Sequence, residues 1–117
     1  MACVGDETVV AYGADGKIWR LVEIDEQPFS ATATLRFPQT GQMTGRGPCN
    51  GYFATMTAPY PWFEAGPIAS TKALCPEIEQ EQVFLSSLSE MTLSEVLGDT
   101  MILSTPKGRS MVFKADA

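Results

Sequence analysis

The chain has 117 residues, which is enough for one domain with a substantial core and too few for two. Its hydrophobic content of 44% and charged content of 19% are ordinary for a globular protein and argue against disorder. The net charge is -6, and the eight basic residues are scattered along the sequence without a run. This pattern disfavours binding to nucleic acid, or to an anionic membrane surface, through a basic patch.

Histidine is absent. Its absence excludes Ser-His-Asp and Cys-His catalytic arrangements and most zinc sites, and cysteines without histidine make a weak metal site. We therefore expect no catalytic residues, no metal and no cofactor. No apolar run approaches the roughly 18 residues that a membrane-spanning helix needs.

Residues 1–16 are predicted to be an N-terminal tail. Cys3 follows the small residue Ala2, and a bacterial lipoprotein carries a small residue just before the cysteine that becomes its acylated first residue. If Met1 was added to a shortened chain, Cys3 is the remnant of a lipidation site. The alternative is a free thiol in the tail, and both interpretations stay open.

Short strands are predicted between the tail and residue 71, in segments rich in β-branched and aromatic residues. They cover residues 18–24, 31–37, 43–47, 53–57 and 66–71. Alternation places these side chains on inward faces: Trp19, Leu21 and Glu23, then Ala33, Leu35 and Phe37. Three glycines and a proline within residues 45–51 predict a kinked or bulged strand.

One helix is predicted over residues 76–89. Pro76 suits the first turn, and acidic residues follow it at the positive end of the helix dipole. An imperfect apolar stripe consists of Ile78, Val83, Phe84, Leu85 and Leu88. After the helix, strands at 91–97, 100–104 and 109–114 form a meander with turns at 98–99 and 106–108, and residues 115–117 are expected to fray.

Tyr60, Trp62 and Phe63 stand between prolines in a segment that is too apolar for an ordinary exposed loop. They either close the core or form a patch for a partner.

Several of these pieces together resemble a known family. They are Trp19; Cys49-Asn50 followed by Tyr52; the run from Gly66 to Thr71 leading to Cys75-Pro76 and Glu81; and the Gly98-Asp99 hairpin with Leu103 and Phe113. In this order and spacing they resemble the META domain of the bacterial HslJ heat-shock lipoproteins, over residues 17–115.

The resemblance implies a mainly β (α+β) fold: a curved antiparallel sheet or a small lipocalin-like barrel with one helix packed on it. It also implies a location in the periplasm or, lipid-anchored, at the outer membrane of a bacterium, with a link to stress tolerance. It brings no catalytic residues.

The marked residues have structural and functional interpretations. Cys49 and Cys75 are expected to form a disulfide in an exported chain, the alternative being two buried thiols. Asn50 is expected to bind nearby backbone beside a bulge, where it would tolerate a left-handed conformation. Alternatively, Asn50, Ser70 and Thr71 line a polar site, or Ser70 and Thr71 cap the turn into the helix. Glu81 is expected to reach Lys72 or Arg46 as an ion pair.

These observations predict a non-enzymatic envelope domain that acts as an interaction or structural module and is a monomer. Its partner would be a protein. The alternative is a carrier that binds a small ligand in a barrel cavity. A lipid anchor is expected at Cys3, and a nucleic-acid partner is not.

Overall fold

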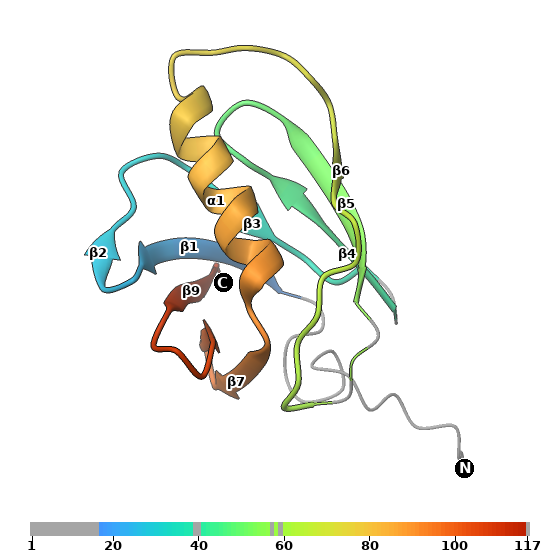
Figure 1. The fold of residues 1–117 in the computed structure, drawn as a ribbon, viewed down its shortest axis with the longest axis vertical. Helices are drawn as coiled ribbons and strands as arrows, with labels where there is room; N and C mark the ends of the chain where they lie inside the picture. Colours follow the sequence, from blue (N-terminus) through green and yellow to red (C-terminus); the bar gives the residue numbers. More distant parts are fainter. Residues whose placement is uncertain (1–16, 39–40, 57, 59, 117) are drawn as a thin grey trace.

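The computed structural model describes residues 17–116 except 39–40, 57 and 59 (Figure 1). The predicted tail and Cys3 therefore lie outside the described residues. Within them, no helix is long and apolar enough to cross a membrane.

In the described part of the chain, two antiparallel sheets and one helix make up the fold (Figure 1). The larger sheet has the order β2-β1-β9-β8-β7, with β3 also paired to β1, and the smaller has the order β4-β5-β6. The strands are β1 (Ile18–Ile24), β2 (Gln27–Pro28), β3 (Thr34–Leu35), β4 (Gly41–Arg46), β5 (Gly51–Met56), β6 (Ala69–Ser70), β7 (Leu93–Leu97), β8 (Thr100–Ser104) and β9 (Ser110–Asp116).

The mainly β fold with one helix is confirmed, but no closed barrel is detected in the described part of the chain. Among the described residues, isolated bridges connect the two sheets and the segments beside them. Arg36 bridges to Thr44 beyond the two-residue strand β3, and Trp62 bridges to Leu93 at the edge of β7. A closed barrel needs continuous hydrogen-bonded pairing between all neighbouring strands, and these isolated bridges do not provide it. The predicted alternative of a small lipocalin-like barrel was therefore wrong.

Strand β1 has the predicted bounds but not the predicted faces throughout. Trp19 and Leu21 are buried as expected. Between Leu21 and Glu23 the pairing with β9 shifts by one residue, which brings Ile24 into the core at 8% exposure. A bulge of this kind reverses the alternation of side chains beyond it. Glu23 was therefore wrongly placed on the inward face.

The kinked strand expected around residues 45–51 is instead a hairpin. Strand β4 ends at Arg46, and β5 begins at Gly51 and returns beside it. Residues 47–50 form the loop, closed by a 2.8 Å hydrogen bond from the Gly47 N–H to the Asn50 carbonyl. The glycines permit close approach, since a Cβ on Gly45 would collide with the Thr34 carbonyl.

Helix α1 (Ile78–Glu90) begins two residues later than predicted and ends one later. Pro76 and Glu77 form a turn ahead of it. Phe84 and Leu88 face the core, and the Phe84 ring lies 5.5 Å from that of Tyr52 in an edge-on contact. Val83, predicted in the apolar stripe, is 52% exposed.

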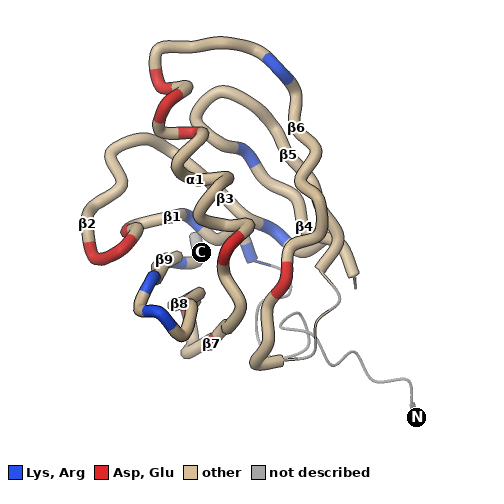
Figure 2. The backbone as a smooth tube through the Cα atoms, in the orientation of Figure 1, with Lys and Arg blue, Asp and Glu red and all other residues tan. Residues whose placement is uncertain are grey.

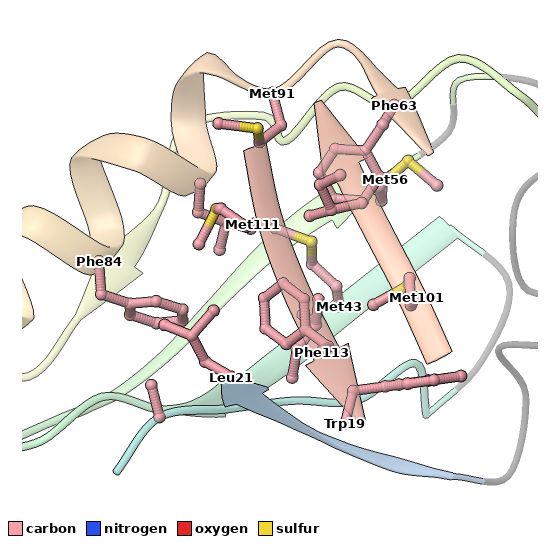
Figure 3. Close-up of a cluster of buried hydrophobic side chains, with 14 of the residues drawn as sticks. Trp19, Leu21, Met43, Met56, Phe63, Phe84, Met91, Met101, Met111 and Phe113 are labelled. Carbon is pink, nitrogen blue, oxygen red and sulfur yellow. The ribbon is translucent and has the colours of Figure 1, made fainter. Parts of the chain in front are cut away.

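The interior is filled by large side chains (Figure 3). Five methionines supply much of the packing between the sheets and α1, and sulfur-containing chains suit such irregular gaps. The largest fully buried side chains are Trp19, Leu35, Met43, Met56, Phe63, Phe84, Leu88, Met91, Met101, Leu103, Met111 and Phe113.

The aromatic segment divides between the core and the surface. Phe63 is buried, and half-buried Tyr60 packs against the core, while its hydroxyl accepts a hydrogen bond from the Val96 N–H. Trp62 remains 56% exposed. At the C-terminus, β9 continues to Asp116, so the expected fraying at residues 115–116 was wrong.

Candidate functional site

Three segments meet at one end of α1: the hairpin loop 47–50, the extended segment 71–75 and the first turns of the helix. Their contacts use Asn50, Thr71, Ala73 and Glu81, together with the cysteines 49 and 75. We call these residues the Asn50 clip. Five of the residues singled out in the sequence come together here: Cys49, Asn50, Thr71, Cys75 and Glu81.

Glu81 is the acceptor at the centre of the clip. Its Oε1 accepts hydrogen bonds from the backbone N–H groups of Cys49 at 2.9 Å and Asn50 at 2.7 Å. Its Oε2 accepts a third from Asn50 Nδ2 at 2.6 Å. Glu81 is only 4% exposed, so a helix side chain satisfies the loop donors away from water.

Asn50 binds the extended segment as a backbone amide would. Its Nδ2 donates to the Ala73 carbonyl at 3.0 Å, and its Oδ1 accepts from the Ala73 N–H at 2.8 Å. The Thr71 hydroxyl donates to the same Oδ1 at 2.8 Å. Asn50 thus bridges α1 and the segment 71–73, and both ends of its side chain are satisfied.

A disulfide joins Cys49 to Cys75, with the Cα atoms 5.7 Å apart. The separation lies within the usual range for such a bridge. The bond connects the same loop to the residues just before α1. The clip is therefore held both covalently and by hydrogen bonds.

The electrostatics of the clip favour an ionised Glu81. Burial alone raises the pKa of this carboxyl, but hydrogen bonds from the Asn50 side chain and two backbone N–H groups, with the nearby charge of Arg46, outweigh it. The pKa of Glu81 therefore lies below its ordinary value of 4.5. The expected ion pair with Lys72 or Arg46 was wrong in form, because amide donors hold the carboxylate.

Two other expectations about the clip are corrected. Asn50 is not in the left-handed region, since the described non-glycine residues with positive φ are Asp25 and Glu26. Thr71 does not cap the helix, because its hydroxyl binds Asn50, and no side chain caps α1 at Glu77.

The remaining marked residues lie on strands or elsewhere. Tyr52 and Ser70 are paired across β5 and β6. The buried Tyr52 hydroxyl donates to the Thr34 carbonyl at 2.6 Å, and burial raises its pKa. Tyr60, Trp62 and Phe63 lie along the edge of β7 and not in the clip.

An open hollow of about 370 Å³ borders the clip between segment 70–74 and α1. Asn50 and Glu81 reach its wall, but their polar atoms are engaged in the bonds above. Leu74 stands beside it with 84% of its surface exposed. No buried side-chain nitrogen or oxygen of the described residues lacks a hydrogen-bond partner.

Sequence reasoning missed a second cluster, centred on Arg109. Its guanidinium contacts Asp25 at 2.8 Å, Glu90 at 3.0 Å and Ser87 Oγ at 3.0 Å. The hydrogen bond from Arg109 is the main cause that lowers the pKa of Asp25. The cluster ties the β1–β2 turn and the end of α1 to the start of β9. No sequence signal could have found it, because the partners are spread over 84 positions.

Over the residues that the structure places, the fold and the clip define a small, mainly β domain with one helix that the clip fixes to the β4–β5 hairpin. The chain belongs to the META domain family, whose profile matches residues 14–117. No curated protein matches the chain in sequence.

Solved structures share the fold. One is the NMR structure of a protein from Burkholderia xenovorans, with a TM-score of 0.70 and 18% identity over 100% of this chain and 94% of that one. Another is the crystal structure of a DUF4847 family protein from Bacteroides vulgatus, with a TM-score of 0.69 and 15% identity over 91% of this chain and 96% of that one. At these identities the likeness concerns the fold alone.

Proposed function

We propose that the chain is a non-enzymatic domain of a bacterial envelope protein, which acts as an interaction or structural module under stress. The META domain occupies residues 17–115 in this proposal. Residues 1–16 form a tail that is acylated at Cys3.

The observation that carries the proposal is the complete use of the clip's polar atoms within the fold. Proton transfer needs a group that can exchange its proton with a substrate. Glu81 is ionised, and its carboxylate is engaged by three donors. Asn50 is similarly occupied by Ala73 and Thr71. The clip is thus built to hold segments together.

The filled interior favours this role over that of a carrier. A carrier encloses its ligand in a cavity with a few converging polar groups. Here Trp19, Met43, Met101 and Phe113 occupy the space between the sheets and are each 0% exposed. A ligand would have to use a hollow that is open to solvent.

The Cys49–Cys75 disulfide supports the envelope location, because disulfides form and persist in oxidising compartments such as the periplasm. A reducing cytoplasm would keep Cys49 and Cys75 as free thiols.

The test compares three forms of the chain in the source bacterium after deletion of its gene. One form carries an export signal and Cys3, the second carries the signal with Cys3→Ser, and the third has no signal. After a high-salt wash of the membranes, we expect the first in the membrane fraction and the second in the soluble periplasmic fraction. Only these two should restore growth after heat or envelope stress.

A form with Lys107→Gln, a change at an exposed turn, serves as the control for expression. Equal rescue by the form without a signal would contradict the envelope location. A Cys3→Ser form that stays in the membrane fraction after a high-salt wash, which releases proteins held by surface charge, would contradict acylation.

A further inference from the structure

Four of the basic residues gather on one face of the molecule. They are Arg20, Arg36, Arg46 and Lys114, all exposed. They are separated by up to 94 positions in the sequence, so no sequence pattern reveals their proximity. The strand register brings them together.

The register places three of them in one row across the strands. Arg20 on β1 lies opposite Lys114 on β9 and, on its other side, opposite Thr34 on β3. The Arg46 N–H donates to Thr34 Oγ1 at 3.1 Å, which extends the row to β4. Facing side chains in such a row have Cβ atoms about 5 Å apart.

The fourth cation lies in the adjacent row. Arg36 bridges to Thr44, and Thr44 pairs in turn with Phe53 on β5. Two rows of a sheet are about 7 Å apart along the strands. The four cations therefore cover one continuous area over β9, β1, β3 and β4, which we call the basic face.

The basic face points away from the core, and its Arg46 lies close enough to one end of α1 for its charge to act on Glu81. Trp19, Leu35 and Phe113, which alternate with the cations along their strands, are buried. Helix α1 packs on that buried side through Phe84 and carries exposed Glu79 and Glu90. Figure 2 shows acidic segments along α1 and basic segments on the strands behind it. The exposed Glu79 and Glu90 of α1 thus lie on the other side of the sheet from Arg20 and Lys114.

Apolar groups lie on the same face. Phe53 is 64% exposed and Ile18 43%. Beside Thr44 and Phe53 there is an open hollow of about 730 Å³, which Pro38 and Pro67 also line. Two acidic residues lie in the next outward row along the strands. Glu23 is paired with Val112, and Val112 connects through Ile102 to Glu95.

We propose that the basic face docks on a bilayer surface that contains anionic phospholipid. The four cations would lie among the phosphate groups, and Phe53 and Ile18 would enter the boundary between headgroups and acyl chains. Basic residues interspersed with exposed apolar ones are typical of surfaces that lie in this interface. This proposal rests on the envelope location proposed above and adds a partner to it.

The net charge of -6 does not prevent this docking. At physiological salt the Debye length is about 8 Å, and helices and sheets pack about 10 Å apart. The acidic residues of α1 are therefore screened from a bilayer that the basic face touches. The sequence analysis disfavoured an anionic membrane surface because the basic residues are scattered along the chain. In the folded protein, strand pairing brings four of them onto one face.

The experiment measures sedimentation of the purified 117-residue chain with vesicles of phosphatidylcholine containing about one third phosphatidylglycerol. Binding is expected with these vesicles and not with phosphatidylcholine alone. Arg36→Gln with Lys114→Gln should weaken it about 30-fold, because each cation near the surface contributes about fivefold. Phe53→Ser should weaken it about tenfold through the lost apolar contact.

The matched control is Lys72→Gln with Lys107→Gln, which changes the net charge equally at exposed sites away from the face. It should leave binding within about twofold. Equal losses in the two double variants, or no binding to anionic vesicles, would overturn the proposal. Tighter binding to heparin than to the vesicles would overturn it in favour of a soluble polyanion. Because no cells are used, any of these results leaves the fractionation test of the envelope location standing.

Discussion

Asn50 and Glu81 are joined by two hydrogen bonds, from Nδ2 to Oε2 at 2.6 Å and from the backbone N–H to Oε1 at 2.7 Å. The pair connects a hairpin loop to a helix 31 positions away, at a site where Glu81 is only 4% exposed. Because the acceptor is charged and shielded from water, these bonds are stronger than ordinary neutral ones.

Replacing Glu81 by Gln should destabilise the fold. One carboxylate oxygen becomes an NH₂ group that faces N–H donors, and the remaining bonds lose the assistance of the charge. We expect a loss of about 2 kcal/mol in the free energy of unfolding, measured by urea denaturation. Glu79→Gln on the exposed side of α1 is the control and should change it by less than about 0.5 kcal/mol. Equal effects of the two substitutions would argue against the clip.

Stability should fall in acid, because the folded state lowers the pKa values of Glu81 and Asp25. The ordinary pKa is 4.5 for Glu81 and 3.8 for Asp25, and each carboxylate stabilises the fold fully at a pH above that value. The stabilisation is lost as the pH falls through the lower pKa of the folded state. Thermal unfolding followed by circular dichroism between about pH 6 and pH 2 should show the decline. Glu81→Gln should show a shallower one, and parallel curves would contradict this assignment.

The disulfide should stabilise the protein without being needed for the fold. Closing a loop with a sequence separation of 26 contributes about 3.5 kcal/mol through the unfolded state. We expect Cys49→Ala with Cys75→Ala to lose about this amount and to keep the circular dichroism spectrum, because the Glu81 hydrogen bonds hold the same segments. Mass spectrometry of the unreduced protein should show the linked peptide. Two thiols at these positions that react with iodoacetamide would refute the bridge.

Gly47 should tolerate no side chain. A Cβ there would lie 2.7 Å from Glu81 Oε1 and 3.1 Å from its Cγ, so the carboxylate would have to leave its donors. We expect Gly47→Ala to cost about 2 kcal/mol in urea denaturation. In the same hairpin, a Cβ on Gly51 would meet nothing closer than 3.8 Å. Gly51→Ala should therefore be nearly neutral, and a similar cost at both glycines would point to backbone strain.

Local patterns predicted much of the fold. Alternation identified β1 and β8 with their observed bounds, and the Gly98-Asp99 turn was predicted with the hairpin around it. Pro76 and the acidic residues after it located α1 to within two residues at each end. These features depend on near neighbours in the chain, which a sequence displays directly.

Other features depended on contacts between distant segments. The glycines around Gly47 indicated an irregular backbone, but the loop was recognisable as a hairpin only once β5 was seen to pair with β4. All the residues of the clip except Ala73 were singled out in the sequence, whereas the bonds from Asn50 to Ala73 and Glu81 were not foreseen.

The sequence by itself determined the mainly β class with one helix and the bounds of β1 and β8, and it placed the two cysteines and Asn50 in META-like blocks. Only the tertiary structure decided which outward residues are neighbours, as with Arg20 and Lys114, and whether Glu81 meets a cation or an amide. The physical reason is that alternation assigns a side chain to a face, while its neighbours across that face follow from strand register, which distant contacts set.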